Sequence, residues 1–285
     1  MYIILDIQAQ LTYISAFESF DSKARLRQTR FPTIYNYLAS LVESKKRIQN
    51  LIDEFGEAES ISISITGSTD YDKQIMTDSA YLHEYNNKDI VKDLKHEFDI
   101  PVIIEQDCIL DAYAELNNLG ENVDEYGLIT VTYGIGGVYV KKEDSKYLVF
   151  PTELGHTIVV PNGLECACGQ RGCVEAYIGG VNMKDRFLTD PKNIEDYRVW
   201  EEAVDFLAIA TSNFMMAFPT KNIIYSGSSI STIPALKNGI KSGLEKRMRV
   251  YKQPKIRVSS LSNQANTLGA LKHIELYKNN SLVRL

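Results

Sequence analysis

The sequence predicts an α/β protein built from two lobes. Short runs rich in β-branched and aromatic residues recur between segments of helical periodicity, and this alternation is typical of α/β proteins. The chain has 285 residues, which is long for one core and suits two domains of roughly 100 to 150 residues each. Hydrophobic residues make up 44% of the chain, enough to fill two cores.

The strands are predicted from their composition and from the turn residues around them. They are YIILDI (2–7), SISISI (60–65), PVIIEQ (101–106), LITVTYG (128–134), GVYVKK (137–142), NIIYSG (222–227) and KIRVSS (255–260).

Two long segments place apolar residues three to four apart and are predicted as helices. The first, residues 31–56, ends on Gly56, and the second, residues 198–219, ends on Pro219. Between the two groups of strands, residues 111–127 predict a helix and a polar turn that cross from one lobe to the other.

Composition argues against several classes of protein. The net charge is −6 and the charged residues are spread evenly, so no basic stripe is available to neutralise a nucleic acid. The start, MYIILDIQAQ, has no cationic leader, and no apolar run approaches the roughly 20 residues that span a bilayer. Four cysteines in such a chain do not suggest a disulfide framework. We therefore expect a soluble cytoplasmic protein.

Three of the four cysteines lie together with a histidine in ELGHTIVVPNGLECACGQRGCVEAY (153–177). His156, Cys166, Cys168 and Cys173 form a set of one imidazole and three thiolates, which suits tetrahedral Zn²⁺ of the structural kind. Interleaved glycines would let the backbone fold tightly around the metal. The alternative is a group of buried free thiols beside a core histidine.

This segment closely resembles the signature of the ROK family (repressors, open reading frames and sugar kinases). That signature runs E-x-G-H, six residues, then G-x-x-C-x-C-G-x-x-G-C-x-E, and every fixed position is filled between Glu153 and Glu175. The resemblance implies an actin-like (hexokinase-like, ribonuclease H-like) fold of two α/β lobes around a central cleft. Sugar would bind at the hinge, and ATP mainly against the C-terminal lobe.

In that fold we expect an N-terminal lobe over residues 1–109, completed by the last helix at about 267–285. Residues 110–266 would form the C-terminal lobe and carry the zinc loop. We also expect a homodimer.

The resemblance also assigns the sugar site. ROK kinases carry a catalytic base in an E-N-D run after a strand that begins with Pro-Val, and this chain has IPVIIEQDC (100–108). Asp107 matches the base, and Gln106 stands where a sugar-binding Asn is usual. The resemblance makes Glu153, His156 and Glu175 ligands of sugar hydroxyls. From its place after a strand alone, Asp107 could equally be a turn or helix-cap residue, and the two glutamates ordinary surface carboxylates.

The nucleotide elements of the family are altered. The first phosphate loop, D-x-G-G-T, keeps Asp6 but has Gln8, Ala9 and Gln10 in place of Gly, Gly and Thr. Side chains are therefore expected where phosphate would pass. The second loop reads TYGIGGV (132–138), with Tyr133 where the family has a phosphate-contacting Thr; a plain glycine-bearing hairpin is the alternative here. The third keeps one glycine in IIYSGSSIS (223–231). The residues assigned to the nucleotide are Asp6, Thr132, Gly134, Gly136, Gly137 and Gly227.

Two functions remain open at this point. The first is an ATP-dependent kinase for a hexose or an N-acetylhexosamine, using Mg²⁺ and Asp107 as general base and having weak activity. The second is a sugar-binding pseudokinase that senses a carbohydrate or supports a partner protein. A repressor would need a DNA-binding domain, and a first strand at Tyr2 leaves no room for one before it. The retained Asp107 favours the kinase, because a pure binder could lose its base freely.

Overall fold

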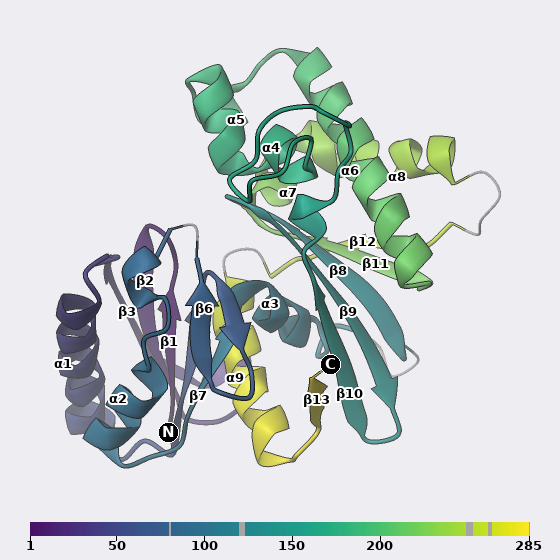
Figure 1. The fold of residues 1–285 in the computed structure, drawn as a ribbon. Helices are drawn as coiled ribbons and strands as arrows, with labels where there is room; N and C mark the ends of the chain where they lie inside the picture. The colour runs from purple at the N-terminus through teal and green to yellow at the C-terminus, as the bar shows by residue number, and fades with distance from the viewer. Residues whose placement is uncertain (80, 120–122, 249–252, 262–263, 285) are drawn as a thin grey trace. The chain divides into compact units, whose positions relative to one another are not determined.

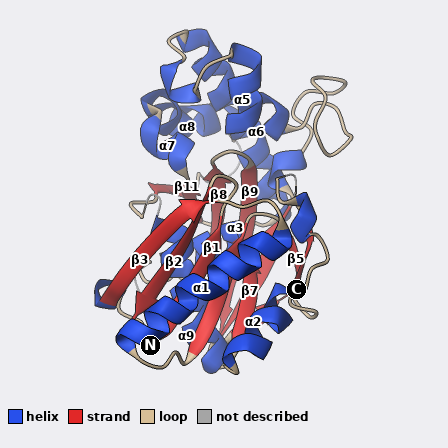
Figure 2. Ribbon diagram, turned by 90° about the vertical axis from the view of Figure 1, so that its left-hand side faces the viewer, coloured by secondary structure: helices blue, strands red, loops and turns tan. Residues whose placement is uncertain are grey.

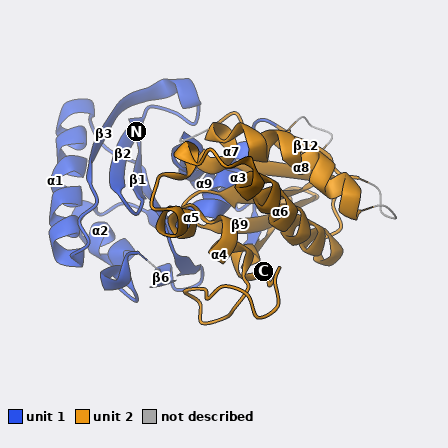
Figure 3. Ribbon diagram, turned by 90° about the horizontal axis from the view of Figure 1, so that it is seen from above, with its two compact units in different colours: residues 1–118, 264–284 blue, residues 119–263, 285 orange. Residues whose placement is uncertain are grey.

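The computed structural model describes residues 1–79, 81–119, 123–248, 253–261 and 264–284. The chain forms two compact units (Figure 3). Unit 1 comprises Met1–Asn118 and Gln264–Arg284, and unit 2 comprises residues 119–263. The structure thus divides after residue 118, whereas the sequence analysis placed the division between residues 109 and 110.

Unit 1 is built on a five-stranded sheet with the order β3-β2-β1-β4-β7 (Figure 1). Its strands are β1 (Tyr2–Ile7), β2 (Leu11–Phe17), β3 (Arg25–Pro32), β4 (Ser60–Ile65) and β7 (Val102–Gln106), and β5 (Ser68–Asp70) pairs with β6 (Ile75–Asp78) beside it. Its helices are α1 (Tyr37–Phe55), α2 (Ile90–Phe98), α3 (Asp107–Glu115) and α9 (Ala265–Lys278), followed by β13 (Leu282–Arg284). The first three strands pair antiparallel, whereas β1, β4 and β7 run parallel.

The alternation of serine and isoleucine in β4 explains how the layers of unit 1 form. Ile61, Ile63 and Ile65 are fully buried in the core beneath α1 and α2. The serines of the same strand point to the opposite face because side chains alternate along a strand. On that face α9 packs closely, and Ser62 Oγ lies 3.4 Å from His273 Nδ1 of α9. Figure 2 shows α1 and α2 in front of the sheet, with α9 behind it.

The five strands that unit 2 contributes to the six-stranded sheet repeat this arrangement with the order β12-β11-β8-β9-β10. Its strands are β8 (Glu125–Val131), β9 (Ile135–Glu143), β10 (Lys146–Thr152), β11 (Asn222–Ser226) and β12 (Lys255–Val258). Its helices are α4 (Val174–Ile178), α5 (Gly180–Phe187), α6 (Tyr197–Ala217), α7 (Ser228–Thr232) and α8 (Pro234–Arg247). As in unit 1, three antiparallel strands are followed by two parallel ones. In chain order both sheets therefore read third, second, first, fourth, fifth.

Two helices differ from the sequence prediction at their ends. The first was expected from residue 31, but Phe31 and Pro32 belong to β3, and α1 begins after Asn36, whose side chain accepts a hydrogen bond from Ala39 N. The last helix was expected to run to about residue 285, a residue that lies outside the described ranges. It ends at Lys278, where Asn280 takes a left-handed conformation with φ of 51° that breaks the helix.

No helix in the described ranges is long and apolar enough to cross a membrane.

Candidate functional site

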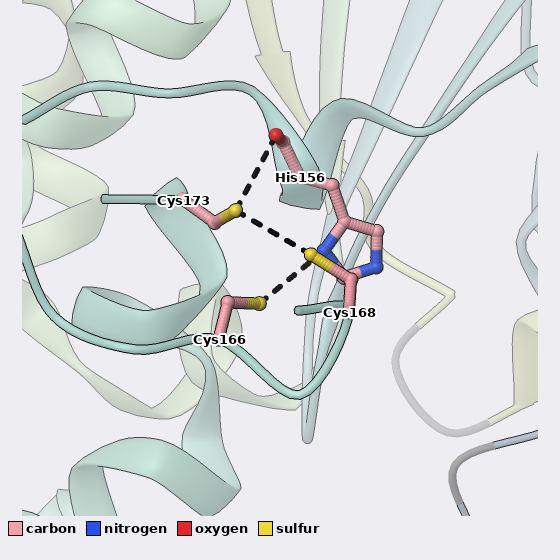
Figure 4. A group of neighbouring side chains, drawn as sticks. All are labelled: His156, Cys166, Cys168 and Cys173. Carbon is pink, nitrogen blue, oxygen red and sulfur yellow. Dashed lines mark hydrogen bonds between the residues drawn. The ribbon is translucent and has the colours of Figure 1, made fainter. Parts of the chain in front are cut away.

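The histidine and three cysteines predicted to bind a metal converge in unit 2 (Figure 4). Their ligand atoms all lie within 4.8 Å of one another. Cys166 Sγ is 3.5 Å from His156 Nδ1, and Cys168 Sγ is 3.7 Å from Cys173 Sγ. Sulfur and nitrogen ligands of a tetrahedral zinc ion are separated by about 3.5 to 3.8 Å, given bond lengths of about 2.3 and 2.0 Å. The four donors therefore fit one tetrahedral metal ion.

The backbone of the cysteine loop (residues 156–173) is shaped for this convergence. Gly169 and Gly172 adopt φ of 87° and 89°, which residues with a Cβ rarely do. Cys166 N donates to Gln170 O at 2.9 Å, which closes a tight turn beside the ligands. Cys173 is fully buried, and burial together with the neighbouring thiols raises its pKa to about 12. A bound cation would have to displace that proton, so metal affinity should fall in acid.

The cysteine loop leads directly into Glu175. Cys173 immediately precedes α4, and Glu175 lies in the first turn of that helix. Its Oε2 accepts a hydrogen bond from Ile135 N at 2.8 Å, at the start of β9. A Cβ on Gly134 would come within 2.7 Å of Glu175 Oε2, and one on Gly155 within 3.0 Å. Two glycines thus make room for this carboxylate.

Glu153 precedes a short 3₁₀ turn, Leu154–His156, and His156 is the last residue of that turn. Glu153 is exposed and His156 half-buried. Because His156 Nδ1 faces the thiols, Nε2 lies on the other side of the ring, where it could bind a ligand (Figure 4).

The glycine-rich segment after β8 forms a hairpin turn, the β8–β9 turn (Thr132–Gly134). Thr132 O accepts hydrogen bonds from Gly180 N at 3.0 Å and Ser229 Oγ at 3.4 Å, so the turn is fastened to α5 and α7. Gly136 N donates to Thr130 Oγ1 at 3.1 Å. A Cβ on Gly137 would come within 2.5 Å of Thr152 Oγ1. Gly227, with φ of 105°, precedes α7.

In unit 1, Gln106 and Asp107 lie where β7 meets α3. Asp107 is the first residue of α3 and its Oδ1 accepts a hydrogen bond from Cys108 N at 2.7 Å. Its surface is partly exposed, yet burial of the carboxyl raises its pKa, while hydrogen bonds from the Thr66 hydroxyl and from backbone N–H groups lower it. Asp107 thus opens α3, accepts a hydrogen bond from the next backbone N–H, and presents a carboxylate with raised proton affinity.

Asp6 lies at the end of β1, close enough to Asp107 for their charges to interact. It is 1% exposed, and burial raises its pKa to about 7. The Ser64 hydroxyl and the Gln8 amide lower that pKa, and Asp107 raises it further. Gln8 Nε2 makes the well-formed hydrogen bond, 2.8 Å from Asp6 Oδ2.

Sequence reasoning missed three residues at these carboxylates. Thr66 contacts Asp107, and Ser64 and Gln8 contact Asp6. The serines of SISISI gave a usable signal, since polar residues in a wholly buried strand need a function or a partner. No local pattern indicates the Gln8 contact.

Several known proteins are similar to this chain in sequence or in structure. A model of the ROK family matches residues 15–275. A xylose repressor from Bacillus subtilis (strain 168) is 26% identical over 231 residues, which are 73% of this chain and 59% of the repressor's length. An N-acetylmannosamine kinase from Escherichia coli O139:H28 is 40% identical over 95 residues, 32% of each chain. The crystal structure of a ROK hexokinase from Thermus thermophilus superposes with a TM-score of 0.78 at 20% identity, covering 97% of this chain and 99% of the hexokinase. The α/β, hexokinase-like fold expected from the sequence is confirmed by that superposition.

Proposed function

Because the chain belongs to the ROK family, we propose that it is a sugar kinase that phosphorylates a hexose or an N-acetylhexosamine slowly, using ATP. Similarity to an N-acetylmannosamine kinase supports the kinase class, although it extends over 32% of the chain. The cytoplasmic location and the homodimer expected from the sequence belong to the same proposal.

The environment of Asp107 is the main support for this proposal. A general base has to be reachable by the substrate and has to hold a proton better than an ordinary carboxylate does. Asp107 is partly exposed, and burial raises its pKa. In the proposed reaction the sugar hydroxyl oxygen bonds to the terminal phosphorus, its proton passes to the Asp107 carboxylate, and ADP leaves.

The proposed ligands of the sugar hydroxyls are Gln106, Glu153, His156 and Glu175. We propose Zn²⁺ as the metal of the cysteine loop, supported by a donor set of one nitrogen and three sulfurs with tetrahedral spacing. The ion has a structural role, because it fixes the start of α4 and with it Glu175.

The two turns assigned to the nucleotide do not fit phosphate groups as they stand. Gln8 covers one oxygen of Asp6, and the space beside Gly134 is filled by Glu175. This misfit is the reason that slow turnover is proposed.

The same misfit favours a second candidate, a sugar-binding protein without turnover. Such a protein would keep the sugar ligands and the metal and would bind no nucleotide. The 26% identity with a xylose repressor is compatible with a protein that binds a sugar for signalling.

An Asp107→Asn variant separates the two candidates. For a kinase, loss of the base should lower kcat by about a hundred- to ten-thousand-fold while sugar affinity changes little, because the amide keeps most hydrogen bonds. The assay uses ATP-Mg²⁺ with a panel of hexoses and N-acetylhexosamines, and calorimetry measures sugar affinity. Asp99→Asn is the matched control, since Asp99 is exposed and its left-handed conformation tolerates Asn. Equal inactivity of wild type and variant with every sugar would reject the kinase.

A further inference from the structure

The turn after the first strand, the β1–β2 turn (Gln8–Gln10), has its backbone fixed from one side. Thr33 Oγ1 donates to Gln8 O at 2.7 Å, Tyr35 Oη donates to Ala9 O at 3.0 Å, and Thr33 N donates to Gln10 O at 3.0 Å. All three carbonyl groups of the turn therefore point toward residues 33–35.

This orientation determines where the amides of the turn point. In a trans peptide the N–H points opposite to the preceding C=O. The N–H groups of Ala9 and Gln10 consequently face away from residues 33–35. The backbone of the turn thus presents donors on its other side, as a phosphate-binding turn does, although it contains no glycine.

The side chain of Gln8 contacts Asp6, the acidic residue just before the turn. Its Nε2 bonds Asp6 Oδ2 at 2.8 Å. Among the described residues Asp6 Oδ1 is buried with no well-formed hydrogen bond, although the Ser64 hydroxyl lies near enough to the carboxyl to lower its pKa. The groups that act on Asp6 are Ser64, Gln8 and Asp107, and none of them is positively charged. The negative charge of the buried Asp6 carboxylate is therefore incompletely compensated, and a cation would bind this carboxylate more strongly than an amide does.

We infer that Gln8 is a built-in cap on Asp6 that competes with the magnesium ion of a nucleotide for this carboxylate. The inference rests on the proposed function, in which Asp6 lies on the nucleotide side of the site. The backbone donors are already oriented, so the cap is the part of the turn that weakens nucleotide binding. Slow turnover then results from the Gln8–Asp6 hydrogen bond rather than from the loss of backbone donors for phosphate.

The test compares Gln8→Met with Gln10→Met. Methionine keeps the length of the side chain but removes the amide donor, and Gln10 is exposed in the same turn. Calorimetry with AMPPNP and Mg²⁺ should show the Gln8 variant binding about ten- to a hundred-fold more tightly than wild type, the value of one charge-assisted hydrogen bond. Gln10→Met should match wild type, and AMPPNP without Mg²⁺ should show no gain. Unchanged or weaker binding by Gln8→Met would overturn the inference.

A second variant keeps the inference testable if Gln8→Met folds poorly. Gln8→Glu places a second carboxylate beside Asp6, so Mg²⁺ alone should raise its melting temperature while leaving that of wild type unchanged. The absence of any Mg²⁺ response in this variant would count against the cap.

The two proposals fail separately in these experiments. If Gln8→Met gains nucleotide affinity but no variant phosphorylates any sugar, the cap stands and the kinase proposal fails. If wild type phosphorylates a sugar and Gln8→Met binds nucleotide as wild type does, the kinase stands and the cap fails.

Discussion

In unit 1 the turn after the first strand is filled by its own Gln8, whereas in unit 2 the corresponding turn is filled by Glu175, forty residues away in the chain. The five strands of each unit follow the same order within their sheets, so these turns are equivalent in topology. The β1–β2 turn is filled by the side chain of Gln8, which hydrogen-bonds Asp6 two residues before it in the sequence. The β8–β9 turn is filled by the carboxylate of Glu175, whose helix α4 directly follows Cys173, one of the four proposed metal ligands.

This difference implies that the two turns respond to different changes. Filling of the β8–β9 turn depends on the cysteine loop, because a disturbed Cys173 would displace the start of α4. Filling of the β1–β2 turn depends on the charge of Asp6 and on one amide. Loss of metal should therefore disturb unit 2, and a change in protonation should disturb unit 1.

The largest effect is expected from Cys168→Ser. The purified protein should contain about one zinc ion per chain, and the variant should lose it together with sugar binding. A structural zinc ion contributes on the order of 10 kcal/mol to local folding, so amide exchange in β9 should accelerate strongly while exchange in β1 changes little. Metal analysis and hydrogen exchange measure the two effects.

Cys108→Ser is the control for this experiment, because Cys108 lies in unit 1 outside the cysteine loop. It should retain the metal. A wild-type protein that contains no zinc after purification without chelator would contradict the assignment, and equal acceleration in β1 and β9 would contradict the comparison of the two turns.

The second effect concerns Asp6 and pH. Its pKa is raised from 3.8 to about 7, so the folded state favours the neutral carboxyl. The resulting stability is fully present below about pH 3.8 and is lost as the pH rises through about 7. Asp6→Asn removes this loss, so the variant should be more stable than wild type at pH 8 by up to about 4 kcal/mol. Denaturant unfolding at pH 5 and pH 8 measures the change.

Asp72→Asn, at an exposed position in the same unit, is the matched control and should unfold as wild type does at both pH values. If Asp6→Asn loses stability at pH 8, then Asp6 is ionised in the folded protein and is better compensated than Gln8 alone allows.

Local sequence patterns predicted the parts of the fold that local chemistry determines. YIILDI and SISISI became β1 and β4 with the expected bounds, because apolar or alternating β-branched runs have few other stable arrangements. The four metal donors came together because their spacing and the glycines between them are all local. Among the described residues, the strands β2, β3, β5, β6, β10 and β13 were not predicted.

For β3, RLRQTRFP, the reason is that the strand lies at the edge of its sheet and is mostly exposed. A strand whose side chains are polar lacks the apolar signal on which sequence prediction depends. Contacts such as Thr66 with Asp107 join residues that follow β4 and open α3, and they depend on tertiary packing, so a single sequence does not reveal them.

The third effect tests how tightly Glu175 fills the β8–β9 turn. Gly134→Ala places a Cβ within 2.7 Å of Glu175 Oε2 and should destabilise the protein by about 1 to 3 kcal/mol. Combining it with Glu175→Ala should remove most of this penalty, since the opposing atom is gone. Urea unfolding of both single variants and the double variant gives the coupling energy.

Gly56→Ala is a control for the glycine itself, because a Cβ there meets no atom within 4 Å but would sit at a φ of 94°. Any loss of stability in this variant reports backbone strain alone and should be unaffected by Glu175→Ala. Additive effects of Gly134→Ala and Glu175→Ala would mean that the carboxylate does not fill the turn.

The smallest effect distinguishes two roles of Glu175 by comparing Glu175→Gln with Glu153→Gln. Both variants should bind the sugar about ten- to a hundred-fold more weakly if both residues hydrogen-bond it, because each loses one charge-assisted bond. Stability should separate them. Glu175 also accepts a hydrogen bond from Ile135 N, so its variant should lose about 1 kcal/mol, whereas Glu153 is exposed and its variant should lose none. Calorimetry with the sugar measures the change in affinity, and thermal unfolding measures the change in stability.

A Glu175 variant that loses stability but binds sugar normally would make Glu175 a support for the turn, and the sugar site would then depend on Glu153 and His156.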